Sequence, residues 1–506
     1  MTVESFSGRI PGPVDARSSC WCPAFNPLLR ANHAPKAMPF LDLPVDLFLA
    51  VFRFLSLDDI LRIRRVCRLP SVWHLLLRTQ IITQSIPFPS GPPGWLNNLG
   101  AGKLEGLVVR AVRSRRNWTS PSPRATRQLE ISIGPTRLPA QERRVIALKF
   151  LTRGPHSYIL SAALSIHARP NPAQLSIECW DINRTPFCIA RRQGPWLGGC
   201  AFNKDASYPP SVAVKGQDSS LQVFSISTTA HNPSAAFATI ARMPGPVHEL
   251  LAFSGSIVLI RNHNDQLFVC DVRRVGHRME LVRPPLPPPQ AAQPTQAEAC
   301  FETLIFNDFL IILRSRFLAI YSLHLFRQAT TSRGVLHPLA HHVWQWSVDS
   351  GRLAFHTSYA RGPQPISVLI RFASSFPWPT NMLNHFVIYP NPPGSHLLYD
   401  FTPIQVQSIS APLRLFALTD MAIGEYNTAV WLDTDTESYF LQASSGQRLA
   451  GCILSRVNEG RVTDTNASTV YNMHEGASWT RVSLDERNDK IAIGTLDGRI
   501  IILELA

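Results

Sequence analysis

The chain is poor in lysine, and this lack decides how its strong positive charge is interpreted. Only six of its 49 basic residues are lysines, so arginine supplies most of the formal net charge of +14. The arginines are spread along the chain and form no compact basic run of the kind found in nucleic-acid-binding arms. The densest group, Arg110, Arg113, Arg115 and Arg116, has helical spacing and indicates a solvated helix face. We therefore expect no nucleic acid among the partners.

Long apolar runs and a cysteine framework are also missing. No stretch approaches the ~18 apolar residues of a membrane-spanning helix, so we expect no membrane partner. Residues 1–37 lack the apolar core of a secretory signal. The nine cysteines are odd in number and show no framework spacing, which favours a reducing compartment. These absences predict a cytoplasmic and/or nuclear protein.

Motifs that would indicate catalysis or a cofactor are absent. There is no Gly-rich phosphate loop, no nucleophile elbow and no His-Glu-x-x-His pair. The cysteine pair within 20–22 lacks the further ligands that zinc requires. Adjacent His341 and His342 would point to opposite faces of a strand, and the nearby Trp344 and Trp346 are interpreted as core. We predict no catalytic residue, no metal site and no cofactor.

What the sequence does contain is a compact helical unit near its start. Leu47, Val51 and Leu55 recur at i, i+4 and i+8, which predicts an amphipathic helix, and Pro44 suits its first turn. Ser56 is placed to cap a second helix, and a third is predicted around Trp73. A unit of about 45 residues is below the size that usually stabilises itself. Its apolar surface therefore needs a partner.

This unit resembles the F-box family. The landmarks are Leu43-Pro44, the aliphatic helix 47–55, the helix start 57–61, Val66-Cys67-Arg68 and Trp73. One departure is the short stretch between Cys67 and Trp73, which contains Pro70. The resemblance implies binding to the Skp-family adaptor of a cullin-RING ubiquitin ligase, and an ordinary helical hairpin is the alternative. The residues expected to contact the adaptor, or to shape the packing behind it, are Leu43, Pro44, Leu47, Val51, Leu55, Leu57, Leu61, Val66 and Trp73.

From about Leu129 onward, short strand-like stretches replace the helical patterns. Five of them share an alternating pattern that closes with a polar and then an aliphatic residue: Leu175–Ile182, Leu221–Ile226, Leu267–Val272, Phe317–Leu323 and Ile500–Leu505. Aligned on positions 180, 224, 270 and 321, the first four are 44, 46 and 51 residues apart, close to one four-stranded propeller blade. The 182 residues from 321 to 503 fit two blades with insertions or three regular ones. We expect seven blades, with eight as the alternative.

Turn residues support this pattern. Asp218, Asn264-Asp265 and Asp497-Gly498 each precede a closing strand, where a tight hairpin favours residues that tolerate positive φ. Ring closure requires the first and last strands to meet, and we expect Val145–Phe150 to pair in the blade completed by the C-terminal hairpin. The proline-rich stretch 283–299 is interpreted as a surface excursion. A pair of β-sandwiches is the alternative fold.

The predicted fold is thus α+β and multidomain, with a small three-helix F-box followed by an all-β, WD-repeat-like propeller. We expect a disordered tail at 1–38, the F-box at 39–85, a linker with one helix at 86–125 and the propeller at 126–506; both Met1 and Met38 stay open as the start. The resemblance implies a non-catalytic, substrate-recognition subunit of an SCF-type ubiquitin ligase, with the adaptor, cullin and an unknown target protein as partners. A scaffold that binds the adaptor outside any ligase, and an enzyme with an axial hydrolytic site, are the alternatives.

Overall fold

The computed structural model divides the chain into two compact units, Met1–Leu55 and Ser56–Ala506. It describes Leu47, Ala50, Val51, Leu55 and Asp59, and then residues 70–505 except for 83–85, 90–93, 134–141, 154–155, 167–173, 197–198, 206, 231, 246, 275, 287–297, 307, 330–332, 357–363, 374–380, 396, 413–418, 435–445, 455–462, 466–467 and 476–477. The predicted tail 1–38, with its cysteine pair and Met38, lies outside the described residues.

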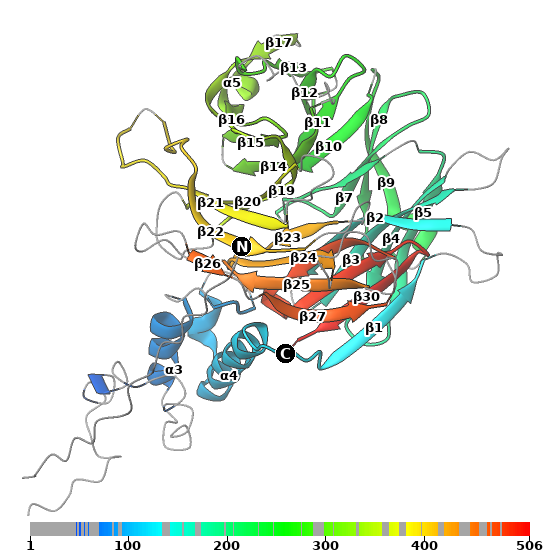
Figure 1. The fold of residues 1–506 in the computed structure, drawn as a ribbon. Helices are drawn as coiled ribbons and strands as arrows, with labels where there is room; N and C mark the ends of the chain where they lie inside the picture. The colour runs from blue at the N-terminus through cyan, green and yellow to red at the C-terminus, as the bar shows by residue number, and fades with distance from the viewer. Residues whose placement is uncertain are drawn as a thin grey trace, which may run out of the picture. The chain divides into compact units, whose positions relative to one another are not determined.

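The described strands of the second unit form seven sheets, which we call blades 1 to 7 (Figure 1). Blade 1 contains β2 (Glu142–Arg153), β3 (His156–Ile166), β4 (Gln174–Asp181) and β5 (Phe187–Gly194). Blade 2 contains β6 (Cys200–Phe202), β7 (Ser211–Lys215), β8 (Leu221–Ile226) and β9 (Phe237–Met243). Blade 3 contains β10 (Glu249–Ser254), β11 (Ile257–Arg261), β12 (Leu267–Asp271), β13 (Arg278–Leu281) and β17 (Arg333–Leu336).

The remaining blades follow in chain order, apart from one strand. Blade 4 contains β14 (Cys300–Phe306), β15 (Phe309–Arg314), β16 (Phe317–Ser322) and β18 (Pro338–Val343). Blade 5 contains β19 (Val348–Phe355), β20 (Ile366–Phe372), β21 (Met382–Ile388), β22 (Ile404–Ser410) and β26 (Thr463–Thr465). Blade 6 contains β23 (Met421–Ile423), β24 (Thr428–Thr434), β25 (Gln447–Ile453) and β27 (Thr469–His474). Blade 7 contains β28 (Trp479–Asp485), β29 (Lys490–Thr495), β30 (Arg499–Glu504) and, from earlier in the chain, β1 (Arg127–Ser132).

The first strands of consecutive blades contact one another all the way round, so the seven sheets close into a β-propeller. We call β2, β6, β10, β14, β19, β23 and β28 the inner strands. Each of the seven junctions between neighbouring blades has its own apolar core. Sharing cores in this way lets every sheet bury both faces, which an isolated blade cannot do. The predicted seven-bladed propeller is therefore confirmed.

The five patterned stretches all lie at the same place in their blades. They form β4, β8, β12, β16 and β30, and each of these is the third strand of its sheet. The interval from 321 to 503 contains two further third strands, β21 and β25, which belong to blades 5 and 6. The prediction of two blades with insertions is thus correct for this interval.

The prediction of which strand closes the ring is wrong. Val145–Phe150 lies in β2, which pairs with β3 as the inner strand of blade 1. The strand that pairs antiparallel with β30 is β1, with Ile131 opposite Ile500. Val145 still packs in the core between blades 7 and 1, so its apolar neighbourhood reflects contact between two sheets and not pairing within one.

Two of the three turn predictions are confirmed. Asp265 and Gly498 adopt positive φ values of 61° and 77°, as a tight hairpin requires. In the turn before β8, the residue with positive φ is Ser219, at 58°, and not Asp218. The Asp218 carboxylate instead accepts a hydrogen bond of 3.1 Å from the backbone N–H of Ser220.

Connections between the third and fourth strands of several blades reach back to the preceding blade. In blade 4 this connection forms α5 (Leu323–Gln328) and then β17, which pairs in parallel with β13 of blade 3. In blade 6 it forms β26, which pairs in parallel with β22 of blade 5. In blade 2 the 3₁₀ helix η4 (Pro233–Ala236) packs against β5 of blade 1. We call these connections straps, because each one ties two blades together.

Candidate interaction site

The described part of the first unit shows an exposed apolar helical face. Leu47, Ala50 and Val51 are helical, and the side chains of Leu47 and Val51 are 53% and 40% exposed. Residues four apart on a helix are neighbours on one face, so these two side chains form a continuous apolar patch. Leu55 is half-buried and lies beyond the helix.

The other predicted adaptor residues divide into two groups. Leu43, Pro44, Leu57, Leu61 and Val66 lie outside the described residues, so their roles stay predictions. Trp73 is fully buried on α3 (Pro70–Leu76). Its burial favours the packing role over a direct contact with a partner.

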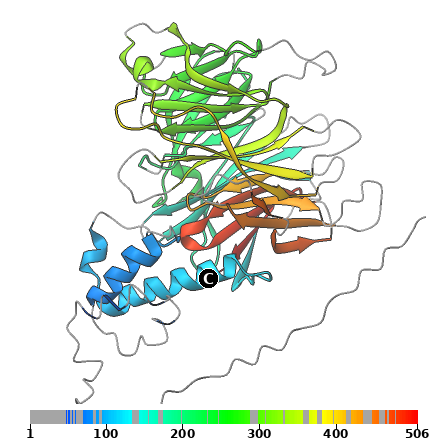
Figure 2. The ribbon, with the colours of Figure 1, turned by 60° about the vertical axis from the view of Figure 1, so that its left-hand side comes forward.

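The third helix of the expected unit packs against the helix predicted in 86–125. That helix is α4 (Ala101–Trp118), and it contacts α3 and the π-helical turn η2 (Leu77–Ile82) (Figure 2). The short 3₁₀ helix η3 (Trp95–Asn98) precedes α4. The buried side chains of α4 follow a helical stripe: Leu104, Val108, Ala111, Val112, Ser114 and Trp118. This stripe explains how the two helices share a core.

The carboxyl-terminal half of α4 is fixed on blade 7 by Asp489. The Asp489 carboxylate accepts hydrogen bonds from the Ser114 hydroxyl and, at 3.4 Å, from the Trp118 indole N–H, and Arg110 lies 3.5 Å away. The Tyr471 hydroxyl donates to the Trp118 carbonyl at 3.0 Å. Burial raises the pKa of Asp489, while Ser114 and Arg110 offset part of that effect. α4 is therefore held to the propeller by a buried polar anchor as well as by apolar packing.

The inner strands carry charged side chains that link the blades around the axis. Lys149 on β2 donates to the carbonyl of Asn203 beyond β6, and Lys204 pairs with Glu302 on β14. Burial, and then the charge of Lys204, lower the pKa of Lys149 to about 7. Burial alone would raise the pKa of Glu302, but the charges of Lys204 and Arg352 outweigh it and hold that pKa below its usual value.

The same chain of contacts continues through blades 5, 6 and 7. Arg352 on β19 lies 3.6 Å from Glu302 and 2.6 Å from Asp420, which also accepts from the backbone N–H of Val482 at 2.9 Å. Arg481 on β28 then donates to the carbonyl of Ile146 on β2 at 2.8 Å. Together with the Lys149 and Lys204 contacts, we call this set the hub network, because it joins residues on or beside the inner strands of six blades, all but blade 3.

Chemistry is sparse in the part of the chain that the structure describes. It contains no group of three or more potential metal ligands, and no helix in it is long and apolar enough to cross a membrane. His341 is exposed while His342 packs against Trp344, so the two histidines do face opposite ways. Trp344 is core, as predicted, but Trp346 is 55% exposed, so that half of the prediction is wrong.

One cluster brings a serine and two histidines together, as in the activation of a nucleophile, but its burial argues against that role. The Ser367 hydroxyl lies 2.9 Å from His385 Nε2 and also contacts His356. Ser367 and His385 are both fully buried in blade 5, where no substrate reaches them. Burial, and then His356, lower the pKa of His385 to about 3, so the imidazole stays neutral.

Sequence reasoning missed both Asp489 and the hub network, although each left a signal. Trp118 continues the apolar stripe of Leu104 and Val108 at helical spacing, which indicates that the helix is buried on something. Lys149 interrupts the otherwise apolar run 145–151, and a charge at such a position indicates a paired or solvated interior site.

Comparison with known proteins gives one family match. Residues 40–76 match the family model described as F-box-like. No curated protein is similar enough to count as a match. Solved structures with some likeness include a chain of a humanized mutant of the Chaetomium thermophilum Polycomb Repressive Complex 2 bound to the inhibitor GSK126, at 8% identity and a TM-score of 0.45, covering 77% of this chain and 98% of that one. The WD40 domain of SCAP from fission yeast is another, at 8% identity and a TM-score of 0.38, covering 75% of this chain and 98% of that one.

The sheets and their closure define the class of this protein as a seven-bladed β-propeller with helices preceding the first strand. More particularly, the chain combines that propeller with an F-box-like segment at residues 40–76. Both modules are of kinds that typically mediate protein–protein interactions. The predicted combination of F-box and propeller is therefore confirmed.

Proposed function

We propose that this chain is the substrate-recognition subunit of an SCF-type ubiquitin ligase. The F-box-like segment binds a Skp-family adaptor, and through it a cullin, while the propeller binds the target protein. In this role the chain is itself non-catalytic and acts in the cytoplasm and/or the nucleus. The observation that carries the proposal is the exposed pair Leu47 and Val51 within the segment that matches the F-box-like model.

The exposed surface of these two side chains can contribute free energy to the binding of a partner. Fully burying a Leu or Val side chain is worth ~1.5 to 3 kcal/mol, and Leu47 and Val51 lie half-exposed on one helical face. A partner that covers both side chains gains roughly half of this energy for each one, because the other half of each side chain is already buried. The proposal assigns that partner as the adaptor, in keeping with the F-box-like match.

The propeller is suited to binding the target protein. Its closed ring and hub network give a rigid platform, and loops on rigid scaffolds are where binding residues concentrate. The Asp489 anchor holds α4 to blade 7. A target bound on the propeller is therefore held at a fixed position relative to α4.

The test is co-purification with a purified Skp-family adaptor. We expect the double variant Leu47→Asp, Val51→Asp to bind at least about 100-fold more weakly, because two apolar contacts are lost and two unpaired carboxylates would be buried against the partner. Ile240→Asp is the matched control, since Ile240 is 49% exposed on β9 of the propeller. Undiminished adaptor binding by the double variant would refute the proposal. Recovery of adaptor without cullin, in any cell extract tested, would instead favour the scaffold role.

A further inference from the structure

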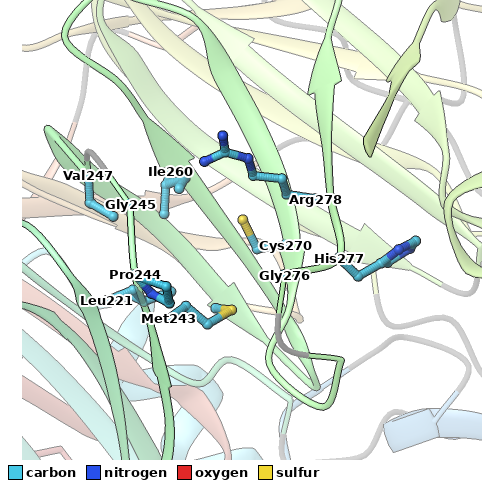
Figure 3. Close-up of a pocket in the computed structure, with 10 residues that line it drawn as sticks. All are labelled: Leu221, Met243, Pro244, Gly245, Val247, Ile260, Cys270, Gly276, His277 and Arg278. Atoms are coloured by element: carbon cyan, nitrogen blue, oxygen red, sulfur yellow. The ribbon is translucent and has the colours of Figure 1, made fainter. Parts of the chain in front are cut away.

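A cavity of about 310 Å³ opens between blades 2 and 3 (Figure 3). Its volume is near the lower end of the range for pockets that hold ligands. Most of its walls are apolar, and they come from both blades and from the turn between them: Leu221, Met243, Pro244, Val247, Ile260 and Cys270. We call this cavity the junction pocket.

Blade 3, which forms one side of the junction pocket, has no strap of the kind seen in blades 2, 4 and 6. The connection between β12 and β13 is only six residues long, 272–277, and it is closed as a local turn. Asp271 accepts from the backbone N–H of Arg273 at 3.0 Å, and the N–H of His277 donates to the Arg274 carbonyl at 2.9 Å. The connection therefore stays on blade 3, in contrast to η4 on β5 and β17 on β13.

One cation is directed over the pocket. Figure 3 shows the Arg278 side chain reaching over Cys270 towards Ile260, whereas His277 points away. The His277 ring instead contacts the carbonyl of Phe326 at 3.0 Å. The Arg278 guanidinium lies 5.2 Å from the centre of the Phe268 ring, and among the described residues no carboxylate pairs with it.

A second cation lies close to the pocket. Lys215 donates to the carbonyl of His248, next to the lining residue Val247, at 2.9 Å. The nearby carboxylate of Asp218 is already paired with Arg242 at 2.6 Å. Two cations, Arg278 and Lys215, thus lie at or close to the pocket, and no described carboxylate neutralises them. A ligand that carries negative charge beside an apolar group complements both parts of the site.

We propose that the junction pocket binds a short segment of the target protein in which a large apolar side chain is flanked by carboxylates. The apolar side chain enters between Met243 and Ile260, and a flanking carboxylate pairs with the Arg278 guanidinium, a charge-assisted contact that is stronger than a neutral one. This inference rests on the proposed function for the identity of the segment as part of a target. The physical binding it describes does not depend on the adaptor.

The test uses the full chain and a defined probe, an acetylated peptide with a central phenylalanine and leucine flanked on each side by two glutamates. We expect it to shift the methyl NMR resonance of Met243, which lines the pocket, and not that of Met473, which is 60% exposed on β27. Arg278→Glu should weaken binding at least tenfold, and Val247→Phe, which fills the cavity, should abolish it. Arg192→Glu is the matched control, because Arg192 also stacks on a phenylalanine, Phe224, at 4.1 Å.

Three results would overturn the inference: no Met243 shift at millimolar peptide, equal binding by Arg278→Glu, or equal binding of a peptide with lysines in place of the glutamates. The same variants are carried through the adaptor co-purification, where both pocket variants should keep the adaptor. Failure of the peptide to bind a chain that still binds adaptor removes the pocket and leaves the proposed function standing. If the wild-type chain fails to bind the adaptor but still binds the peptide, the proposed function is removed and the junction pocket stands.

Discussion

Lys204, just beyond the inner strand of blade 2, pairs with Glu302 on the inner strand of blade 4, although blade 3 lies between these two blades in the ring. This ion pair therefore links two blades that are not neighbours in the ring. Glu302 also lies 3.6 Å from Arg352, so one carboxylate serves two cations from different blades. Glu302 thus joins two cations of the hub network, whereas Lys204 is paired with this one carboxylate.

Replacing the two partners should accordingly give unequal losses of stability. We expect Lys204→Met to cost less than ~1 kcal/mol, because Lys204 is 44% exposed and solvent screens its charge. Glu302→Gln should cost about 1 to 3 kcal/mol, because it leaves Lys204 and Arg352 without a shared counter-charge. Urea denaturation of the two single variants and of the double variant measures both losses and their coupling.

The exposed ion pair of Arg242 and Asp218 supplies the control for this comparison of single and double variants. Both side chains are largely in solvent, 64% and 49% exposed, so removing either should change stability by less than about 0.5 kcal/mol. Equal losses for Lys204→Met and Glu302→Gln would contradict the central place given to Glu302.

The Asp489 anchor makes a separate prediction about α4. Asp489→Ala should leave the Ser114 hydroxyl and the Trp118 indole N–H buried without an acceptor, at a cost of about 1 to 3 kcal/mol. Hydrogen exchange should speed up in residues 101–118 while the strands of blades 1 to 5 keep their protection. Asp308→Ala is the control, since Asp308 pairs with Arg327 at the surface; equal effects of the two changes on α4 would count against the anchor.

How far the sequence determined these features differs from blade to blade. Trp180, Phe224, Cys270 and Tyr321 could be aligned because their blades have nearly equal lengths. Blades 5 and 6 gave no such alignment, since segments such as 389–403 and 454–468 interrupt the spacing on which the pattern depends. The closing strand β1 was missed for another reason: only Leu129 and Ile131 in it are apolar, whereas the inner strand β2 carries a stronger apolar pattern.

The interaction sites were predictable only where they are local in sequence. The F-box-like landmarks lie within one short segment, so spacing alone indicated them. The junction pocket draws its walls from separate strands and turns, from Leu221 to Arg278, and no single stretch carries its signature. Its walls come from two blades and the turn between them, and these meet only in the assembled ring.

His385 predicts a pH dependence of stability whose sign follows from its lowered pKa. In the unfolded chain its pKa is 6.5, and in the folded chain about 3, so the unfolded state binds a proton that the folded state does not. Its contribution to stability is therefore complete above pH 6.5 and is lost as the pH falls towards 3, by up to about 1.4 kcal/mol per pH unit.

The measurement compares the free energy of unfolding at pH 7 and pH 5 in wild type and in His385→Gln. The slope should be shallower in the variant, because glutamine does not titrate. His474→Gln is the control, since His474 also contacts a serine hydroxyl, that of Ser478 at 2.8 Å, but is only partly buried. An unchanged slope in His385→Gln would show that His385 takes up its proton without unfolding the blade.

Gly494 makes the last prediction, about the seam where the ring closes. A Cβ at this position of β29 would lie 2.5 Å from Val145 Cγ1 and 2.7 Å from Val145 Cβ, on the inner strand of blade 1. Real Cβ atoms do not approach so closely, and a β-branched side chain beside the backbone cannot turn away. Gly494→Ala should therefore destabilise the propeller by about 1 to 3 kcal/mol through overpacking. Thermal unfolding measures the loss.

Two further variants separate this steric cause from a general cost of replacing glycine. Gly106→Ala on α4, where nothing lies within 4 Å of the new Cβ, should stabilise the chain by about 0.5 to 1 kcal/mol, because alanine favours the helix. Adding Val145→Ala to Gly494→Ala should recover part of the loss, since the smaller side chain makes room at the seam. If the double variant lost more stability than the two single variants together, the close approach of Gly494 and Val145 would not explain the loss in Gly494→Ala.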